Sequence, residues 1–180
     1  MANCFDNVPY EAIDTCPNEE ISSGTASRGF YAPVNFVEKM VLPPNTGALG
    51  TALTIEADNL TLKSDKTWKG IDFQQNETEL KNTLVGNVGN KKGKSELEFK
   101  VAGFRAEVID FVNRYKNVPM VFVIPDAMGQ LWVIGTKLNG AFIETADSTT
   151  GKKADEDSGT MVKITCNSKV YKYAGTIAEG

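Results

Sequence analysis

Residues 86–95, GNVGNKKGKS, contain the residue types of a phosphate-binding loop and end on Gly93-Lys94-Ser95. Such a loop needs four residues between its first glycine and its Gly-Lys pair, so that successive N–H groups can surround a phosphate. Only three residues separate Gly89 from Gly93, and the following ELEFKV alternates like a strand instead of opening a helix. We therefore predict a glycine-rich hairpin connection rather than a nucleotide site. Its lysines should be solvated, with contact to an acidic neighbour as a second use: Lys91, Lys92 and Lys94.

Two aspartates in the stretch DSTTGKKADEDSG (147–159) have the spacing that begins a calcium-binding loop. Asp155 and Asp157 are two apart, but Gly159 comes one position early and Cys166 stands where a glutamate is needed. A solvated run of charges is the better interpretation. A loop of about thirteen residues is long for a domain, which indicates a functional or mobile segment.

The chain lacks the side chains that most enzymes and metal sites use. It has no histidine, which removes the commonest general base and the commonest metal ligand. Its three cysteines, Cys4, Cys16 and Cys166, form no CxxC pair, and their odd number argues against a disulfide framework. Cys166 alternates with apolar residues and should be a small buried side chain. We predict no catalytic residue, no cofactor and no metal site, hence no enzyme, in a reducing intracellular setting.

Composition and charge narrow the class of partner. The 180 residues carry a net charge of −4, so a basic groove that reads DNA is not expected. A mildly acidic surface suits a wall that nucleic acid must pass without binding. The N-terminus has no signal-peptide pattern, and no apolar run approaches the length of a transmembrane helix. We expect a soluble protein made in the cytoplasm, without classical export and without a membrane partner.

Residues 1–50 differ in composition from the rest of the chain. They hold five of the seven prolines, and a proline lacks the N–H that a strand ladder uses. We predict an extended N-terminal arm or edge segment, which either docks on a neighbouring subunit or is an ordinary irregular lead-in. Apolar side chains would hold this segment in place: Phe30, Tyr31, Phe36, Val41 and Leu42.

Residues 51–180 should form a single β-rich domain of about eight to ten short strands. Alternating apolar and β-branched residues predict strands, with a turn at 57–59, in these ranges: 51–63, 68–74, 79–87, 96–102, 118–135, 140–146 and 160–175. In 96–102, three apolar residues share one face: Leu97, Phe99 and Val101. Near the end of the chain, Tyr171 and Tyr173 also share one face.

One segment has a helical pattern, with spacings of four, three and four residues over about 103–116. Its apolar face consists of Phe104, Val108, Phe111 and Tyr115. Charged residues occupy the other faces, and Pro119 should stop the helix.

The range 118–135 is apolar on both faces of its two strands and has a turn-forming cluster at 125–129. We expect this hairpin to be central and covered on both sides. Trp68 and Trp132 should be core residues rather than platforms for a sugar. These elements predict a mainly β fold, a β-sandwich or barrel with one packed α-helix, and not a parallel α/β sheet.

The segment 104–175 resembles tail-tube-like structural proteins of tailed phages, particularly those that infect Bacteroidetes. In that family a helix precedes a hairpin, a loop with glycine and aspartate follows, and a last strand ends in Tyr and Gly. The matching positions are Asn117, Val121, Phe122, Ile124, Asp126, Gly129, Val133, Gly135, Gly151, Asp155, Gly159, Tyr173 and Gly175. An early pattern of Cys4, Cys16 and Gly24 is also similar, although the first 100 residues match only loosely.

The resemblance implies a β-sandwich subunit that closes into a ring, usually of six, whose rings stack into a tail tube through which genomic DNA leaves the capsid. The partners would be copies of the chain and other tail or neck proteins, in a virion assembled in the host cytoplasm. Six copies at −4 give about −24 per ring, so DNA would slide past without binding. The alternatives are a neck, collar or tail-terminator ring protein, or a monomeric capsid-decorating or adhesin-like binding module.

Contacts between subunits would then come from the N-terminal arm (1–50), the 146–159 loop and the exposed edges of strands. The lysines near 91–94 should lie outside the tube or at ring joints, not in the channel. The contact candidates are Phe30, Tyr31, Phe36, Lys91, Lys92, Lys94, Asp155, Asp157, Tyr171 and Tyr173.

Overall fold

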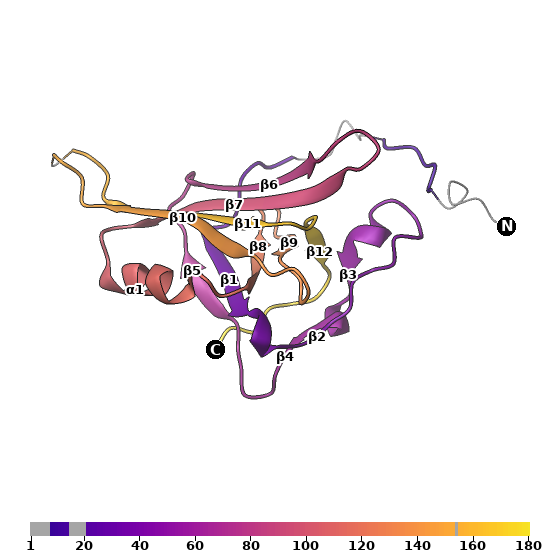
Figure 1. The fold of residues 1–180 in the computed structure, drawn as a ribbon, viewed down its shortest axis with the longest axis horizontal. Coiled ribbons are helices and arrows are strands. Elements are labelled where there is room, and N and C mark those ends of the chain that lie inside the picture. Colours follow the sequence, from indigo (N-terminus) through magenta and orange to yellow (C-terminus); the bar gives the residue numbers. More distant parts are fainter. Residues whose placement is uncertain (1–7, 15–20, 154) are drawn as a thin grey trace.

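The structure is a computed structural model that describes residues 8–14, 21–153 and 155–180. Cys4 and Cys16 lie outside these residues. The fold is mainly β, as predicted, with two larger sheets whose strands cross one another and one described α-helix at their side (Figure 1).

Six strands form the first sheet, in the order β3-β12-β9-β8-β1-β5. They are β3 (Thr54–Ile55), β12 (Tyr171–Tyr173), β9 (Leu131–Ile134), β8 (Met120–Pro125), β1 (Arg28–Pro33) and β5 (Lys69–Asp72). The second sheet has the order β10-β11-β7-β6 and contains β10 (Phe142–Thr149), β11 (Gly159–Cys166), β7 (Lys92–Ala102) and β6 (Thr78–Val85). A small third sheet pairs β2 (Val37–Met40) with β4 (Leu60–Leu62).

Neighbouring strands are antiparallel, except for β12 and β3, which are parallel. The described part of 51–180 forms ten strands, which agrees with the predicted eight to ten, and β1 and β2 add two more in the N-terminal segment. The range 51–63 is broken by short 3-10 turns. These turns are η3 (Thr51–Leu53) and η4 (Ala57–Asn59), and a further one, η2 (Val34–Phe36), joins β1 to β2.

The main core lies between the two larger sheets. Leu97 and Phe99 of β7 form the predicted apolar face and meet Phe122 and Ile124 of β8. Burying each of these side chains stabilises the fold by about 1.5–3 kcal/mol. Cys166 also lies in this core, as predicted, and its thiol is 3.2 Å from the carbonyl oxygen of Asn139.

The opposite face of the six-stranded sheet is buried as well. Val121 and Val123 of β8 pack there against Trp68 and against residues of the β2–β4 sheet. The strand β8 therefore has buried side chains on both faces, which confirms the prediction for this half of the hairpin, whereas Leu131 and Trp132 of β9 are only half-buried. Trp68 is a core residue, also as predicted.

The helix α1 (Ala106–Tyr115) confirms the predicted helix to within a few residues. Val108, Phe111 and Tyr115 pack against the main core. Phe104 does not join them: it precedes the helix and is 52% exposed, because Gly103 turns the chain with a φ of 82°. Among the described residues, no helix is long and apolar enough to cross a bilayer.

The N-terminal segment differs from the prediction of an arm or edge segment from residue 28 onward. β1 lies inside the six-stranded sheet, between β8 and β5. Pro33 is tolerated because it is the last residue of the strand, where the ladder ends. The residues from Arg28 on therefore belong to the same folded unit as the later strands.

Gly135 and Gly129 both have a left-handed backbone conformation, with φ of 90° and 80°, but their surroundings differ. A Cβ on Gly135 would lie 2.5 Å from the carbonyl oxygen of Met120, which accepts a hydrogen bond from the N–H of Ala141. A Cβ on Gly129 would meet nothing within 4 Å.

We expect Gly135→Ala to destabilise the fold by at least about 3 kcal/mol, because strain and a backbone clash add together. Gly129→Ala should lose only about 1–2 kcal/mol, the cost of the left-handed backbone. Denaturant unfolding of the two variants measures the difference. Equal losses would show that the close approach at Gly135 is not a constraint.

Candidate interaction surface

The residues that resemble a phosphate loop lie in the β6–β7 hairpin. Its turn spans 86–91, and Gly93, Lys94 and Ser95 are part of β7, where they pair with β6. The predicted hairpin connection is confirmed. Ser95 is fully buried between β6 and β11, so this tripeptide forms part of a sheet ladder and not a cradle for an anion.

The three lysines of this hairpin have different surroundings. Lys91 and Lys92 are exposed where the turn enters β7, as predicted. Lys94 follows the second predicted use, contact with an acidic neighbour: its Nζ lies 2.6 Å from Glu96 Oε1 and its side chain is only 26% exposed. Residues two apart on a strand share a face, which brings these two side chains together. The hydrogen bond from Lys94 to Glu96 raises the pKa of Lys94 and lowers the pKa of Glu96.

The loop between β10 and β11 spans 150–158 and is shorter than predicted, because β10 continues to Thr149. Asp155 is exposed, and Asp157 forms an ion pair with Lys100 at 3.1 Å. The hydrogen bond from Lys100 lowers the pKa of Asp157. In the ranges that the structure describes, no group of three or more acidic or cysteine side chains is placed to hold a metal ion.

The N-terminal aromatic candidates contact their own chain. Tyr31 stands edge-on to the rings of Phe111 and Tyr115, with centroids 5.1 Å and 5.8 Å away. Phe30 packs against the second core, and the Nζ of Lys66 lies 5.0 Å from the ring centroid of Phe36.

Tyr171 and Tyr173 lie on one face of β12, as predicted, and both are buried within their own chain. The hydroxyl of Tyr173 donates to the carbonyl oxygen of Ala57 at 3.0 Å. Burial raises the pKa of both phenols. Little of either ring remains for a neighbouring subunit.

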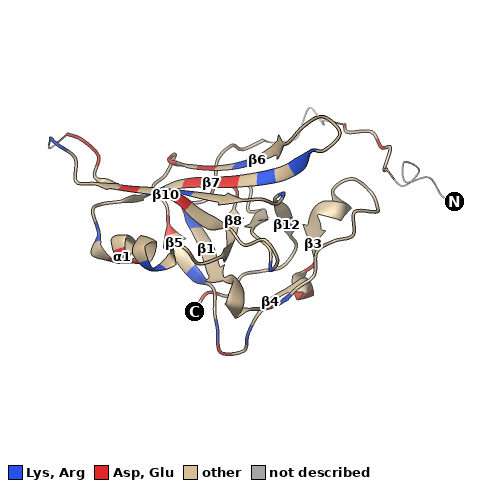
Figure 2. Cartoon of the chain, in the orientation of Figure 1, with Lys and Arg blue, Asp and Glu red and all other residues tan. Residues whose placement is uncertain are grey.

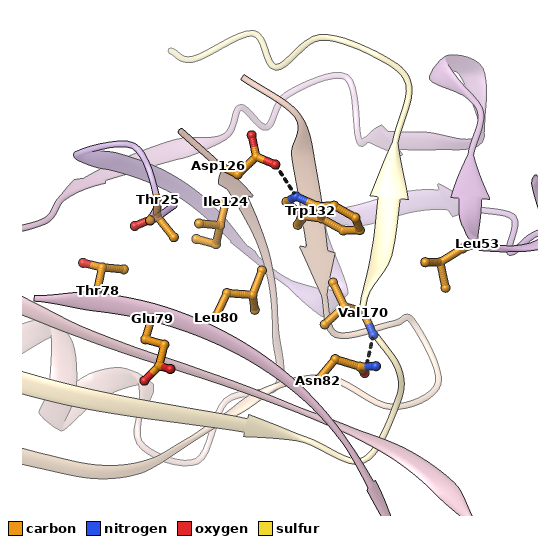
Figure 3. Close-up of a pocket in the computed structure, with 11 residues that line it drawn as sticks. Thr25, Leu53, Thr78, Glu79, Leu80, Asn82, Ile124, Asp126, Trp132 and Val170 are labelled. Atoms are coloured by element: carbon orange, nitrogen blue, oxygen red, sulfur yellow. Dashed lines mark hydrogen bonds between the residues drawn. The ribbon is translucent and has the colours of Figure 1, made fainter. Parts of the chain in front are cut away.

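A cavity of about 360 Å³ opens between the sheets beside β6 (Figure 3). Trp132 is half-buried in its wall, which differs from the prediction of a core residue. The carboxylate of Asp126 accepts hydrogen bonds from Met128 N at 2.9 Å, Gln130 N at 2.8 Å and Trp132 Nε1 at 2.9 Å. Since this carboxylate is saturated with donors from the β8–β9 hairpin, it stabilises the turn and is poorly placed to act as a general base.

Two long strands of the four-stranded sheet have an unpaired outer edge. Within the described part of the chain, β6 pairs with β7 alone and β10 with β11 alone, each strand being eight residues long. Each carries an exposed large apolar side chain, Leu84 at 69% and Phe142 at 42%. Free N–H and C=O groups beside apolar side chains are a template for pairing with another chain.

The sequence interpretation did not single out these two edges. A usable signal was present, because TELKNT (78–83) and ETADST (144–149) each contain a single apolar residue, Leu80 or Ala146, and solvated edge strands are often this polar. The exposed Leu84 and Phe142 lie next to these polar stretches and had no obvious core role.

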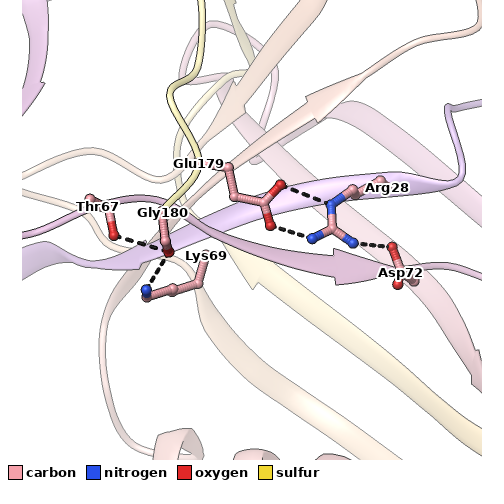
Figure 4. A network of polar contacts seen from close by, with 6 residues as sticks. All are labelled: Arg28, Thr67, Lys69, Asp72, Glu179 and Gly180. Carbon is pink, nitrogen blue, oxygen red and sulfur yellow. Dashed lines mark hydrogen bonds and ion pairs between the residues drawn. The ribbon is translucent and has the colours of Figure 1, made fainter.

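The six-stranded sheet offers much shorter edges. At one border β3 has two residues, and at the other β5 has four. The β5 border is also tied to the C-terminal segment, because Arg28 forms ion pairs with both Asp72 and Glu179 (Figure 4). Glu179 also forms an isolated β-bridge with Trp68. Lys69 and Thr67 donate to the carbonyl oxygen of Gly180 at the same place.

One face of the four-stranded sheet carries the charged residues whose positions along its strands Figure 2 shows. Its core face packs on the six-stranded sheet, so the alternate residues of β6 and β7 point to solvent. The charged side chains pair with one another: Lys81 with Glu79, Lys94 and Lys163 with Glu96, Lys163 with Glu144, and Lys100 with Asp157. The face is therefore strongly polar but has few free cations.

Comparison with models of protein families, with curated proteins and with solved structures found no significant match. We therefore argue function from the geometry of the chain itself, above all from the two free edges and the charged face between them.

Burial, and then the neighbouring Tyr115, raise the pKa of Tyr31 to about 12 from its usual 10.0. A phenol whose pKa is raised on folding contributes stability that is present below about pH 10 and lost as the pH approaches 12. Tyr31→Phe should therefore lose less stability than the wild type between about pH 10 and 12.

Denaturant unfolding at a series of alkaline pH values measures this loss. Tyr10→Phe is the matched control for the loss of a phenol, because the Tyr10 ring is fully exposed and removing its hydroxyl disturbs no core contact. Identical alkaline profiles for Tyr31→Phe and the wild type would contradict the placement of Tyr31 within its own chain.

Proposed function

We propose that this chain is a structural protein of a tailed-phage virion, whose copies pair edge to edge into a ring and whose rings stack into a tube for DNA ejection. The unpaired edges of β6 and β10 carry the proposal. They are the longest free edges of the described sheets, and they border the same sheet on opposite sides.

The directions of the strands suit a repeating contact. Strands alternate in direction from β6 through β7 and β11 to β10, so β6 and β10 run antiparallel. A second copy placed beside the first in the same orientation presents its β10 antiparallel to the first copy's β6. Each copy would then pair through β6 with one neighbour and through β10 with the other. Such a heterologous contact can close into a ring.

The size of such a ring supports a conduit for DNA. Six copies, the number that the family resemblance implies, would bring about 24 strands into one wall. At a spacing of about 4.8 Å between strands, this wall is about 115 Å around and about 37 Å across before tilt widens it. A DNA duplex fits within this width.

The second layer decides which face would line the channel. The six-stranded sheet and α1 cover the core face of the four-stranded sheet, so they would lie outside and the charged face inside. Its lysines are already held by carboxylates, so a passing phosphate backbone meets few free cations. Lys94 would then face the channel, unlike the expectation for the lysines near 91–94.

Two alternative functions would use the edges of β6 and β10 differently. A neck, collar or tail-terminator ring would use the same edge pairing without stacking. A monomeric capsid-decorating or adhesin-like module would leave both edges free, and the cavity beside β6 favours this second candidate.

Leu84→Lys should prevent assembly without unfolding the subunit, because Leu84 is 69% exposed and lies on the free edge strand. We expect the wild type at high concentration to form rings or filaments in negative-stain images, and the variant to remain monomeric by size exclusion with light scattering.

Val88→Lys is the matched control, since Val88 is 96% exposed in the neighbouring turn and outside the strand. It should form rings like the wild type, because Val88 lies outside the β6–β10 contact. A wild-type chain that stays monomeric at every concentration would favour the binding module and reject the ring.

The two ends of the four-stranded sheet carry charged loops. Lys91 and Lys92 lie where the β6–β7 turn enters β7, and the β10–β11 loop at the opposite end carries the exposed Asp155 and Glu156 beside Lys152 and Lys153. In the proposed tube the strands of this sheet would run from one end of a ring to the other, so these two loops would meet where rings stack.

The double change Lys91→Glu and Lys92→Glu should leave single rings intact and shorten or abolish filaments, as counted in electron micrographs. Filaments of normal length would exclude this contact.

A further inference from the structure

We propose that β6 of one copy and β10 of the next pair in one register, with Leu84 opposite Ile143 and Lys81 opposite Asp147. This inference rests on the proposed ring and names the residues by which copies recognise one another. It goes beyond the ring itself, because edge pairing alone would allow several registers.

The faces of the two strands restrict the choice of register. Residues directly opposite one another in a sheet point to the same face. On β6, Leu80 pairs with the buried Leu97, so Leu80, Asn82 and Leu84 form the core-facing set.

The core-facing set of β10 is interrupted by a bulge. Ile143 pairs with the buried Ile164, and Ala146 pairs with the buried Val162, although only one residue of β11 separates these two partners. Glu144 and Thr145 therefore share one place in the ladder. Ser148 follows on the core side and Asp147 on the charged side.

The apolar ends of the two strands favour one of the remaining registers. When Leu84 lies opposite Ile143, Val85 lies opposite Phe142. Leu84 at 69% exposure and Phe142 at 42% are then both covered by apolar neighbours. A shift by two residues leaves Phe142 beyond the end of β6, against the polar turn.

The same register pairs opposite charges. With the bulge opposite Thr83, Asn82 meets Ala146 and Lys81 meets Asp147 on the charged face. A shift of two residues in the other direction places Glu79 opposite Asp147, and like charges directly opposite one another destabilise a sheet. Electrostatics and apolar burial thus select the same alignment.

A charge exchange tests the pair Lys81–Asp147. Lys81→Glu and Asp147→Lys should each weaken assembly about tenfold, and the double variant should restore it. Within one copy these residues lie on opposite edges of the sheet, three strand spacings or about 14 Å apart, so rescue must act between copies. Sedimentation velocity measures the change in association.

The single change Lys81→Glu also removes an ion pair with Glu79 in the same chain, so each variant is checked for an unchanged unfolding midpoint. A double variant that assembles no better than Lys81→Glu alone overturns the proposed charge pair.

Engineered cysteines test the register directly. In a background with Cys4→Ser and Cys16→Ser, the pair Leu84→Cys and Ile143→Cys should form disulfide-linked oligomers under mild oxidation. Directly opposite residues have the Cα separation that a disulfide needs.

The pair Leu84→Cys and Ala146→Cys is the matched control, because its second cysteine lies one core-facing place out of register. Cross-links in this control and not in the first pair would overturn the register while leaving the ring intact. Rings with no cross-link in either pair would also overturn the register. A wild-type protein that never associates overturns both the ring and the register.

Discussion

An edge strand leaves one row of backbone N–H and C=O groups to water, and this constraint shapes the surface of the chain. The six-stranded sheet limits the problem with a two-residue strand at one border and with the Arg28–Glu179 contact near the other. The four-stranded sheet does not, since both of its borders are eight residues long. An isolated subunit with two such edges is a template for association, and the useful question is what keeps association specific.

Exposed side chains on the edge strands can make association specific, and they cost the isolated subunit little stability. Lys81, Glu79 and Asp147 are exposed on the edge strands, where charges discourage pairing with an arbitrary apolar strand. The bulge at Glu144–Thr145 breaks the regular alternation of β10, so a partner strand must match that irregularity. Leu84 and Phe142 supply the apolar gain at one end only, which gives the contact a direction.

The elements that sequence predicted well are those whose pattern is local. The period-two alternation of Leu97, Phe99 and Val101 specifies the buried face of β7, and the helical spacing of Val108, Phe111 and Tyr115 specifies α1. The apolar run of β8 indicated burial on both sides for the same reason. What sequence could not give is the order of strands, because β1 pairs with β5 and β8, from which it is separated by many residues. The composition of 1–50 therefore suggested an edge segment, while the strand lies inside a sheet.

The residues predicted as contacts between subunits include three tyrosines that pack within their own chain. Aromatic residues are often found at contacts between subunits, but Tyr31, Tyr171 and Tyr173 pack into the core of their own chain. Lys94 likewise is held by Glu96, a pairing that the i, i+2 spacing on a strand could have indicated.

The closed ring that we propose, rather than an open fibre, would follow from these features. Sheets twist with a fixed hand, and a bulge adds local bending, so repeated β6–β10 contacts curve instead of extending in a plane. The second layer lies on one face of the four-stranded sheet alone, which leaves room for curvature only toward the charged face. Curvature toward the charged face would bring its ion pairs around a lumen. It would place the six-stranded sheet and α1 on the outside, where the circumference is larger. In the proposed assembly, the same asymmetry that makes one sheet face apolar would also distinguish the inside from the outside.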